Sequence, residues 1–271
     1  MLEYIEKCEI CPHKCKVNRI NGNIGRCKSK DTVKVALASI HNFEEPCISG
    51  ENGSGTIFFS NCNMNCVYCQ NYEISQQGLG KEITIQRLAE IFIEQQEKGL
   101  KLPIVYNTNA YESVETLKML EGYIDIYLPD LKYANNHIAK HFSKVENYFE
   151  TATKAIKEMY RQVGECTFDN RGIMKKGVII RHLVLPNNIE NSKKVLKWIE
   201  QNMSHNIFVS IMAQYFPTYK TKEIEDLNRK LTKEEYNEIE QYLYGLKLEN
   251  GYIQELGEHE EEYVPQWILN V

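Results

Sequence analysis

The chain has 271 residues, a formal net charge of −5, and a composition that is 42% apolar and 25% charged. This composition is typical of a globular protein with a sizeable core, and the lack of a basic excess disfavours nucleic acid or an anionic membrane as the main partner. The sequence has neither the apolar segment of a signal peptide nor an apolar run of 18 residues. We therefore expect no membrane span and a cytoplasmic location.

Cysteine is the residue type with the most informative distribution. In a reducing compartment, nine cysteines are more typical of metal ligands or redox groups than of disulfides. Two are isolated, Cys47 and Cys166, and we interpret both as small buried hydrophobic residues. The other seven form two groups, one of Cys8, Cys11, Cys15 and Cys27, the other of Cys62, Cys66 and Cys69.

The first 32 residues are rich in cysteine and in turn-forming residues, so we expect a metal-binding segment over 1–32 and a second domain over 33–271. A strand is predicted at 33–39. Further strands are predicted at 56–61, 103–108, 124–132, 178–186 and 207–212, and helices at 83–99, 111–122, 147–163, 192–203 and 231–246. We expect Thr84 to cap the first of these helices and Gly99 to end it, and Thr232 and Glu235 to form a capping box on the last.

Alternating strands and helices predict βαβ units, a parallel sheet and a partial (β/α) barrel of the TIM type. The apolar run 56–61 suits a strand buried on both faces. In such folds the chemistry lies at the carboxyl ends of the strands. The polar residues predicted at these ends are Cys62, Asn107, Thr108, Asn109, Asp130, Lys132, Arg181, Gln214 and Tyr215.

Arg181 stands out because it lies on an otherwise apolar strand. A charged group inside a barrel strand needs a partner, and a ligand carboxylate or ribose would supply one. Side chains alternate along a strand, so His182 is expected to face the other way and to have a structural role.

The spacing C-x3-C-x2-C of Cys62, Cys66 and Cys69 indicates a soft-metal site. Structural zinc takes four ligands, and no fourth ligand lies nearby at finger spacing. An iron–sulfur cluster normally takes four cysteines, so three would leave one iron open to a substrate or cofactor. Zinc binding, or a role in packing the loop, is the alternative.

Four stretches of the sequence resemble a known superfamily. GTIFFSNCNMNCVYCQNYEIS, PIVYNTNAYE, DIYLPDLKY and IIRHLVLP are similar to the radical S-adenosylmethionine (SAM) superfamily, and within it to an uncharacterised subgroup of pyruvate formate-lyase activating enzyme-like proteins. The resemblance runs from about Tyr4 to Tyr242. The cysteine motif is specific for the superfamily, and the other stretches are specific for the subgroup but not for a substrate.

The resemblance implies an oxidoreductase with a [4Fe–4S] cluster on Cys62, Cys66 and Cys69, and with SAM bound to the fourth iron. Reductive cleavage of SAM would give a 5′-deoxyadenosyl radical that abstracts hydrogen. The residues that would contact the cofactor are Tyr68, near the adenine, and Asn107, Thr108, Asn109, Asp130, Lys132 and Arg181.

The family also implies partners. A glycyl radical enzyme would be the protein substrate, and a flavodoxin or ferredoxin the electron donor. Radical modification of another peptide or of a small molecule is an alternative, and so is a non-catalytic, metal-stapled binding protein.

One departure from the family matters. Its members carry a further βα unit between the helix at 83–99 and the strand at 103–108, and that unit bears a Gly-Gly-Glu-Pro-like element that holds the cofactor's amino group. The segment Glu44-Glu45-Pro46 lies upstream of the cysteines and does not replace it. We therefore expect a barrel that is one unit short, with an unpaired gap or a rearranged sheet.

The N-terminal quartet has the spacing C-x2-C-x3-C-x11-C. Four thiols in a loop-rich segment suit either tetrahedral zinc or a second iron–sulfur cluster. Either metal would stabilise a segment that is too small to fold alone.

Overall fold

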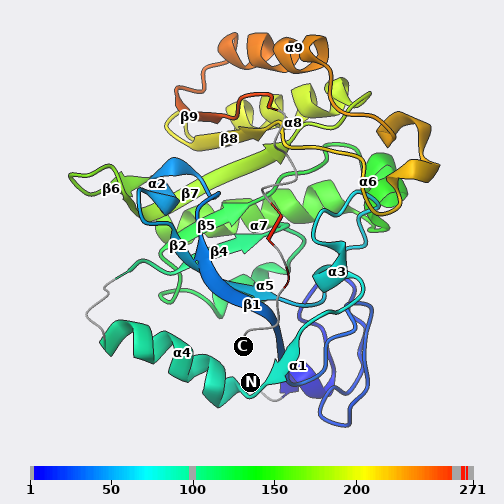
Figure 1. Cartoon of the computed structure of the whole chain (residues 1–271), viewed down its shortest axis with the longest axis vertical. Helices are drawn as coiled ribbons and strands as arrows, with labels where there is room; N and C mark the ends of the chain where they lie inside the picture. Colours follow the sequence, from blue (N-terminus) through cyan, green and yellow to red (C-terminus); the bar gives the residue numbers. More distant parts are fainter. Residues whose placement is uncertain (1–2, 98–101, 258–263, 266, 268–271) are drawn as a thin grey trace. The chain divides into compact units, whose positions relative to one another are not determined.

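The computed structural model describes residues 3–97, 102–257, 264, 265 and 267 (Figure 1). The chain divides into two compact units. Unit 1 comprises residues 1–64, 71–103 and 265–271, and unit 2 comprises residues 65–70 and 104–264. The cysteine-rich residues 1–32 thus fall in the same unit as the segment that follows them, and a separate N-terminal domain stays a prediction.

Unit 1 contains a three-stranded sheet in the order β2-β1-β3. The central strand β1 (Val33–His41) is antiparallel to both β2 (Ser54–Phe59) and β3 (Lys81–Ile83). The prediction that the apolar run of β2 is buried on both faces is wrong, because Phe59 is 48% exposed. β2 pairs with the strand that precedes it in the chain, as expected for two strands joined by a short connection.

The helices of unit 1 are short except for α4 (Ile85–Glu97). The predicted cap of α4 is confirmed, since Thr84 Oγ1 accepts a hydrogen bond of 3.0 Å from the Arg87 N–H. None of its apolar residues up to Phe92 is fully buried. The predicted end at Gly99 lies outside the described residues. The remaining helices of the unit are α1 (Glu3–Glu6), α2 (Pro46–Ser49) and α3 (Tyr72–Ser75).

Unit 2 contains a sheet in which β4, β5, β7, β8 and β9 are parallel, in that order. Their bounds are β4 (Val105–Thr108), β5 (Ile126–Pro129), β7 (Met174–Leu183), β8 (Phe208–Met212) and β9 (Asn250–Ile253). The short β6 (Thr167–Phe168) lies antiparallel to β7. The four predicted strands are confirmed, while β6 and β9 were not predicted. β4 is the edge strand, and within the described residues no strand pairs with its other side.

The helices of unit 2 connect and cover this sheet (Figure 1). They are α5 (Val114–Lys118), α6 (Asn136–Ser143), α7 (Tyr148–Val163), α8 (Ile189–Asn202) and α9 (Lys233–Tyr244), with 3₁₀ turns at Thr221–Glu223 and Glu225–Leu227. Predictions for α7, α8 and α9 are confirmed, including the capping box of Thr232 and Glu235. The helix predicted at 111–122 is much shorter, and α6 was not predicted. All four residues of β5 are buried, which places the core of the unit along this strand.

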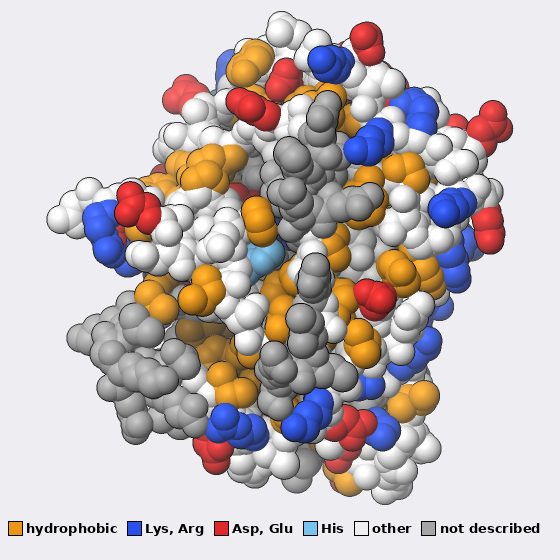
Figure 2. Space-filling view, in the orientation of Figure 1, with side chains coloured by type: hydrophobic (Ala, Val, Ile, Leu, Met, Phe, Trp, Pro, Cys, Tyr) orange, Lys and Arg blue, Asp and Glu red, His pale blue; other side chains and the backbone are white. Residues whose placement is uncertain are grey.

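The surface mixes charge types. On the face shown in Figure 2, basic and acidic side chains are interspersed, and apolar side chains reach the surface between them. None of the described helices combines the length and apolar character that crossing a lipid bilayer requires.

Candidate functional site

The carboxyl ends of three neighbouring parallel strands bring four predicted site residues together. Arg181 on β7 donates from Nε to Asp130 Oδ1 at 2.9 Å and from an Nη to Asn107 Oδ1 at 2.6 Å. Lys132 Nζ donates to Asp130 Oδ2 at 2.7 Å. Asp130 and Arg181 also form a parallel bridge that extends the pairing of β5 with β7. The sequence prediction that these side chains share one edge of a sheet is confirmed.

In this strand-end cluster, formed by Asn107, Asp130, Lys132 and Arg181, the amide of Asn107 is exposed, whereas the three charged side chains are largely shielded from solvent. The side chains of Arg181, Asp130 and Lys132 are 12%, 14% and 16% exposed. Burial opposes ionisation of Asp130, but the charges of Arg181 and Lys132 outweigh it and hold the pKa of the carboxyl below its usual value. Two cations against one anion leave a net positive charge in a low-dielectric setting, which suits a ligand carboxylate.

The other two residues predicted at the end of β4 have positioning roles in the structure. Thr108 Oγ1 donates to Glu112 Oε1 at 2.7 Å, and Asn109 Oδ1 accepts from the Tyr111 N–H at 2.9 Å. Both contacts fix the turn that leaves the strand. Asn107 is therefore the residue of this triplet that contacts Arg181.

Tyr148, the first residue of α7, secures the same strand ends. Its buried hydroxyl lies 2.7 Å from the carbonyl oxygen of Asp130 and 3.1 Å from that of Asn109, and it accepts from the Lys132 N–H at 3.0 Å. One hydroxyl thus ties the loops after β4 and β5 to α7. The sequence places Tyr148 at the start of a helix but carries no signal for this role.

His182 faces away from the cluster, as predicted. Its Nδ1 lies 2.7 Å from the Leu131 carbonyl oxygen and its Nε2 lies 2.8 Å from Ser192 Oγ on α8. Burial lowers the pKa of His182 to about 4, so the ring is neutral at pH 7. It joins the sheet to a helix and has no place in the strand-end cluster.

The two residues predicted after β8 also prove to be internal supports. The Gln214 carbonyl oxygen accepts from Gln70 Nε2 at 2.6 Å, and the buried Tyr215 hydroxyl donates to the Leu227 carbonyl oxygen. Gln70 follows Cys69 directly, so this contact anchors the end of the cysteine segment 65–70 within unit 2.

A buried chain of hydroxyl groups leads to the sulfur of Cys66. Ser143 Oγ donates to Cys66 Sγ at 3.0 Å, Tyr133 and Ser143 hydroxyls lie 2.6 Å apart, and the Tyr68 hydroxyl contacts that of Tyr133. Burial, and then the neighbouring Tyr133, raises the pKa of Tyr68 well above its usual value. Tyr68 is thus a neutral, buried core residue whose hydroxyl is hydrogen-bonded to that of Tyr133, and it supports the cysteine segment.

The other two cysteines of the motif are half-buried. Cys62, which belongs to unit 1, accepts a hydrogen bond of 3.4 Å from the Met64 N–H, and the Cys69 N–H donates to the Cys66 carbonyl oxygen at 3.3 Å. Within the described residues, no group of three or more His, Cys, Asp or Glu side chains is arranged to hold a metal ion. The motif is suited to an iron–sulfur cluster by the chemistry of its ligands, which are three thiols. The sulfur atoms of Cys62 and Cys66 also accept hydrogen bonds.

The N-terminal quartet is organised around a buried guanidinium. Arg19 is only 5% exposed; it donates to Cys27 Sγ at 3.3 Å and to the Ser29 carbonyl oxygen. The pKa of Cys11 is raised, mainly by burial and also by the nearby charges of Cys27, Cys15 and Cys8. The four thiols therefore lie within electrostatic reach of one another.

Arg19 was not recognised from the sequence. A buried cation requires an anionic partner, and deprotonated thiols would provide it. Two arginines, Arg19 and Arg26, lie between the third and fourth cysteines, and the structure buries Arg19 and exposes Arg26. The sequence alone does not tell which of the two is buried.

The fold and this site define an α/β protein with a polar cluster, largely shielded at its charged members, at the carboxyl ends of three parallel strands. A comparison with models of known protein families finds no match. The chain is 33% identical to the uncharacterized protein MJ0674 of Methanocaldococcus jannaschii, in a match that covers 88% of this chain and 73% of the relative. The chain belongs to the same family as that protein.

Proposed function

We propose that this protein is a radical SAM enzyme that uses a [4Fe–4S] cluster held by Cys62, Cys66 and Cys69. The main observation in support is the strand-end cluster. It brings together Asn107, Asp130, Lys132 and Arg181 at the strand ends, where the sequence resemblance implies the cofactor contacts. The cysteine motif supplies the complementary donors. The fold supports a partial (β/α) barrel, since five parallel strands run in sequential order.

In this proposal, each of the residues around the site has a distinct role. When bound, the cluster and SAM supply an organic radical that removes a hydrogen atom from the substrate. Arg181 and Lys132 provide the net positive charge that a cofactor carboxylate needs, and Asp130 keeps both cations in place. Ser143 donates to the Cys66 sulfur, and Tyr133 and Tyr68 exclude water behind it.

The same proposal includes the substrate class. The sequence resemblance favours activation of a glycyl radical enzyme, with hydrogen removed from a backbone glycine and with a flavodoxin or ferredoxin as electron donor. The quartet around Arg19 would hold zinc or a second iron–sulfur cluster, since a buried guanidinium offsets part of the charge of four thiolates.

A second candidate is a metal-stapled binding protein without catalysis. The observation that favours it is the pairing of β2, which is antiparallel to β1 and lies in the sheet of unit 1. The strand that precedes the cysteine motif is therefore not part of the parallel sheet. We also expect the chain to lack the βα unit that family members carry between the helix at 83–99 and the strand at 103–108. Loss of the cofactor site along with that unit is the physical basis of this alternative.

One experiment separates the two. The protein is reconstituted with iron and sulfide without oxygen, and SAM and dithionite are then added. Formation of 5′-deoxyadenosine is expected with the wild type and with Cys166→Ala, and is expected to disappear in Cys66→Ala. An iron-loaded wild type that yields no 5′-deoxyadenosine would favour the binding protein, and a protein that takes up only zinc would exclude both the cluster and the enzyme.

A further inference from the structure

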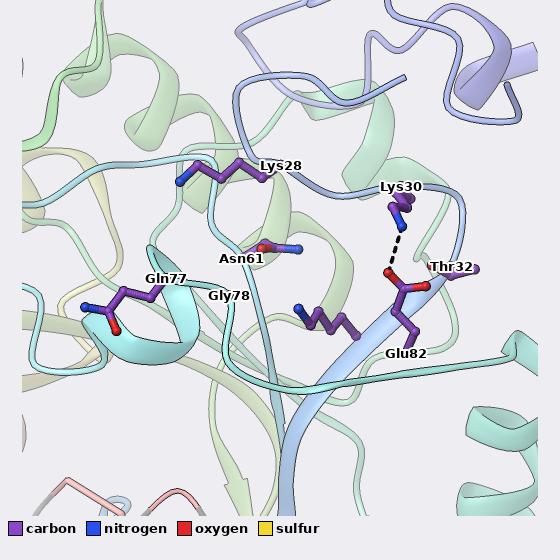
Figure 3. Close-up of a pocket in the computed structure, with 8 residues that line it drawn as sticks. Lys28, Lys30, Thr32, Asn61, Gln77, Gly78 and Glu82 are labelled. Carbon is purple, nitrogen blue, oxygen red and sulfur yellow. Dashed lines mark hydrogen bonds and ion pairs between the residues drawn. The ribbon is translucent and has the colours of Figure 1, made fainter. Parts of the chain in front are cut away.

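A polar cavity of about 270 Å³ lies in unit 1, apart from the residues of the strand-end cluster. Figure 3 shows side chains from separate segments around it. They come from the end of the cysteine-rich segment, the start of β1, the residue before Cys62, the turn between α3 and β3, and β3 itself. The lining residues are Lys28, Lys30, Thr32, Lys34, Asn61, Gln77, Gly78 and Glu82.

The cavity carries excess positive charge. Three lysines face a single carboxylate, that of Glu82, which pairs with Lys30 at 3.1 Å. Lys28 Nζ donates to the Gln76 carbonyl oxygen at 3.1 Å. Because this carbonyl is neutral, it does not compensate the positive charge of Lys28. The ammonium group of Lys34 forms no hydrogen bond or ion pair with any other residue that the structure describes, although it lies close enough to Glu82 to help lower the pKa of that carboxyl, after the larger effect of Lys30.

The remaining lining groups are donors of the kind that anions use. Thr32 contributes a hydroxyl, and Asn61 and Gln77 contribute amides. Gly78 keeps the wall open: its φ is +70°, and a Cβ there would lie 3.2 Å from Asn61 Oδ1 and 3.7 Å from Lys34 Nζ. Any side chain at this position would be strained and would narrow the space between these two groups.

We propose that this lysine cavity binds the phosphate or diphosphate group of a small molecule. Its volume lies just below the range of roughly 300 to 1,000 Å³ that is typical of sites for drug-sized ligands. Its charges surround a hollow, which favours a compact polyanion over the broad acidic surface of a protein. Lys34 is the principal contact because its charge is the least engaged, and Lys28 is the second.

Calorimetric titration of the full chain with inorganic pyrophosphate at low ionic strength tests the proposal. The wild type is expected to bind at one saturable site. Lys34→Met and Lys28→Met are each expected to weaken binding by about tenfold, a loss of about 1.4 kcal/mol. Lys34→Arg should retain binding, because the charge is kept. Lys154→Met on α7 is the matched control, since it removes an exposed lysine in unit 2 and should leave the affinity unchanged.

Three outcomes would overturn the proposal. These are no saturable binding by the wild type, equal weakening by Lys154→Met and Lys34→Met, or binding that Lys34→Met does not weaken. The third outcome would also result if pyrophosphate only removed a bound metal from the protein, because that heat would not depend on Lys34. Metal analysis of the protein before and after the titration detects this case. Titration with adenosine diphosphate then identifies the source: tighter binding than pyrophosphate points to a nucleotide, and equal binding points to the phosphate group alone.

Discussion

Asp130 is the residue on which the strand-end cluster depends, because its carboxylate contacts both Arg181 and Lys132. Its pKa is held low by these two cations. Its contribution to stability is therefore complete above its unfolded pKa of about 3.9 and is lost as the pH falls through its lower folded value. At neutral pH the cluster is intact, and removing the anion leaves two buried cations facing each other.

Asp130→Asn is therefore expected to lower the free energy of unfolding by about 3 to 5 kcal/mol at pH 7, the cost of breaking a buried ion pair. Urea unfolding measures it. Glu190→Gln, which removes an exposed partner of Lys193, is the control and should cost less than about 1 kcal/mol. Equal effects of the two changes would show that the cluster is not electrostatically important to the fold.

His182 gives stability a distinct pH dependence. Its folded pKa of about 4 lies below the unfolded value of about 6.5, so the unfolded chain binds the extra proton between these values. Stability should fall by about 3 kcal/mol as the pH is lowered from about 6.5 to 4. In His182→Gln this part of the pH dependence should vanish. Urea unfolding at several pH values checks it, and an unchanged slope in the variant would contradict the assignment.

The role of a residue could be predicted from the sequence where a simple physical rule applied. Arg181 needed a partner because it interrupts an apolar strand, and His182 faced away because strand side chains alternate. Ser143 and Tyr148 could not be predicted, since their roles depend on contacts with residues outside their own segments. Arg19 contacts Cys27 only eight residues away, but nothing local distinguishes it from Arg26. No local pattern distinguishes a tyrosine that begins a helix from one that also anchors two strands.

At the scale of elements, the long helices α7, α8 and α9 and the apolar strands β4, β5, β7 and β8 were predicted correctly because their patterns are strong, whereas the shorter α6 was missed. The strand β2 was predicted, but its burial on both faces was not correct, because a short apolar run fits both a doubly buried parallel strand and a half-exposed antiparallel one. β9 was missed because Asn-Gly at its start favours a turn. Its glycine instead allows close pairing of the backbone with β8.

Gly251 makes that pairing specific. Its φ is +148°, and a Cβ there would lie 1.9 Å from the Val209 carbonyl oxygen. Gly251→Ala should therefore displace β9 and lower the free energy of unfolding by more than about 2 kcal/mol. Gly122→Ala is the control, because Gly122 has φ +86° but open space around it, and should cost about 1 kcal/mol of backbone strain alone. Similar losses in urea unfolding would argue against the steric explanation.

At the scale of the whole molecule, the chain consists of two units, and the cysteine-rich segment falls in unit 1. This segment contains one short helix, α1, and no strand among its described residues. If the quartet holds a metal, most of the order of this segment comes from the metal and from Arg19, and little from an apolar core.

Chelation should therefore act locally. Removing metal from the quartet is expected to increase amide exchange across residues 1–32 and to leave exchange in β5 and β7 of unit 2 unchanged. Mass-detected hydrogen exchange measures both regions in one experiment. Cys15→Ala should reproduce the effect without chelator, and Cys47→Ala should not. If amide exchange across residues 1–32 were the same before and after chelation, a structural metal in this segment would be contradicted.

The central claim is that Cys62, Cys66 and Cys69 hold a cluster with one iron open to SAM. Electron paramagnetic resonance of the reduced, reconstituted protein, recorded with and without SAM, tests it most directly. We expect the signal of a reduced [4Fe–4S] cluster whose g values shift when SAM is added. A spectrum that SAM leaves unchanged would contradict the claim.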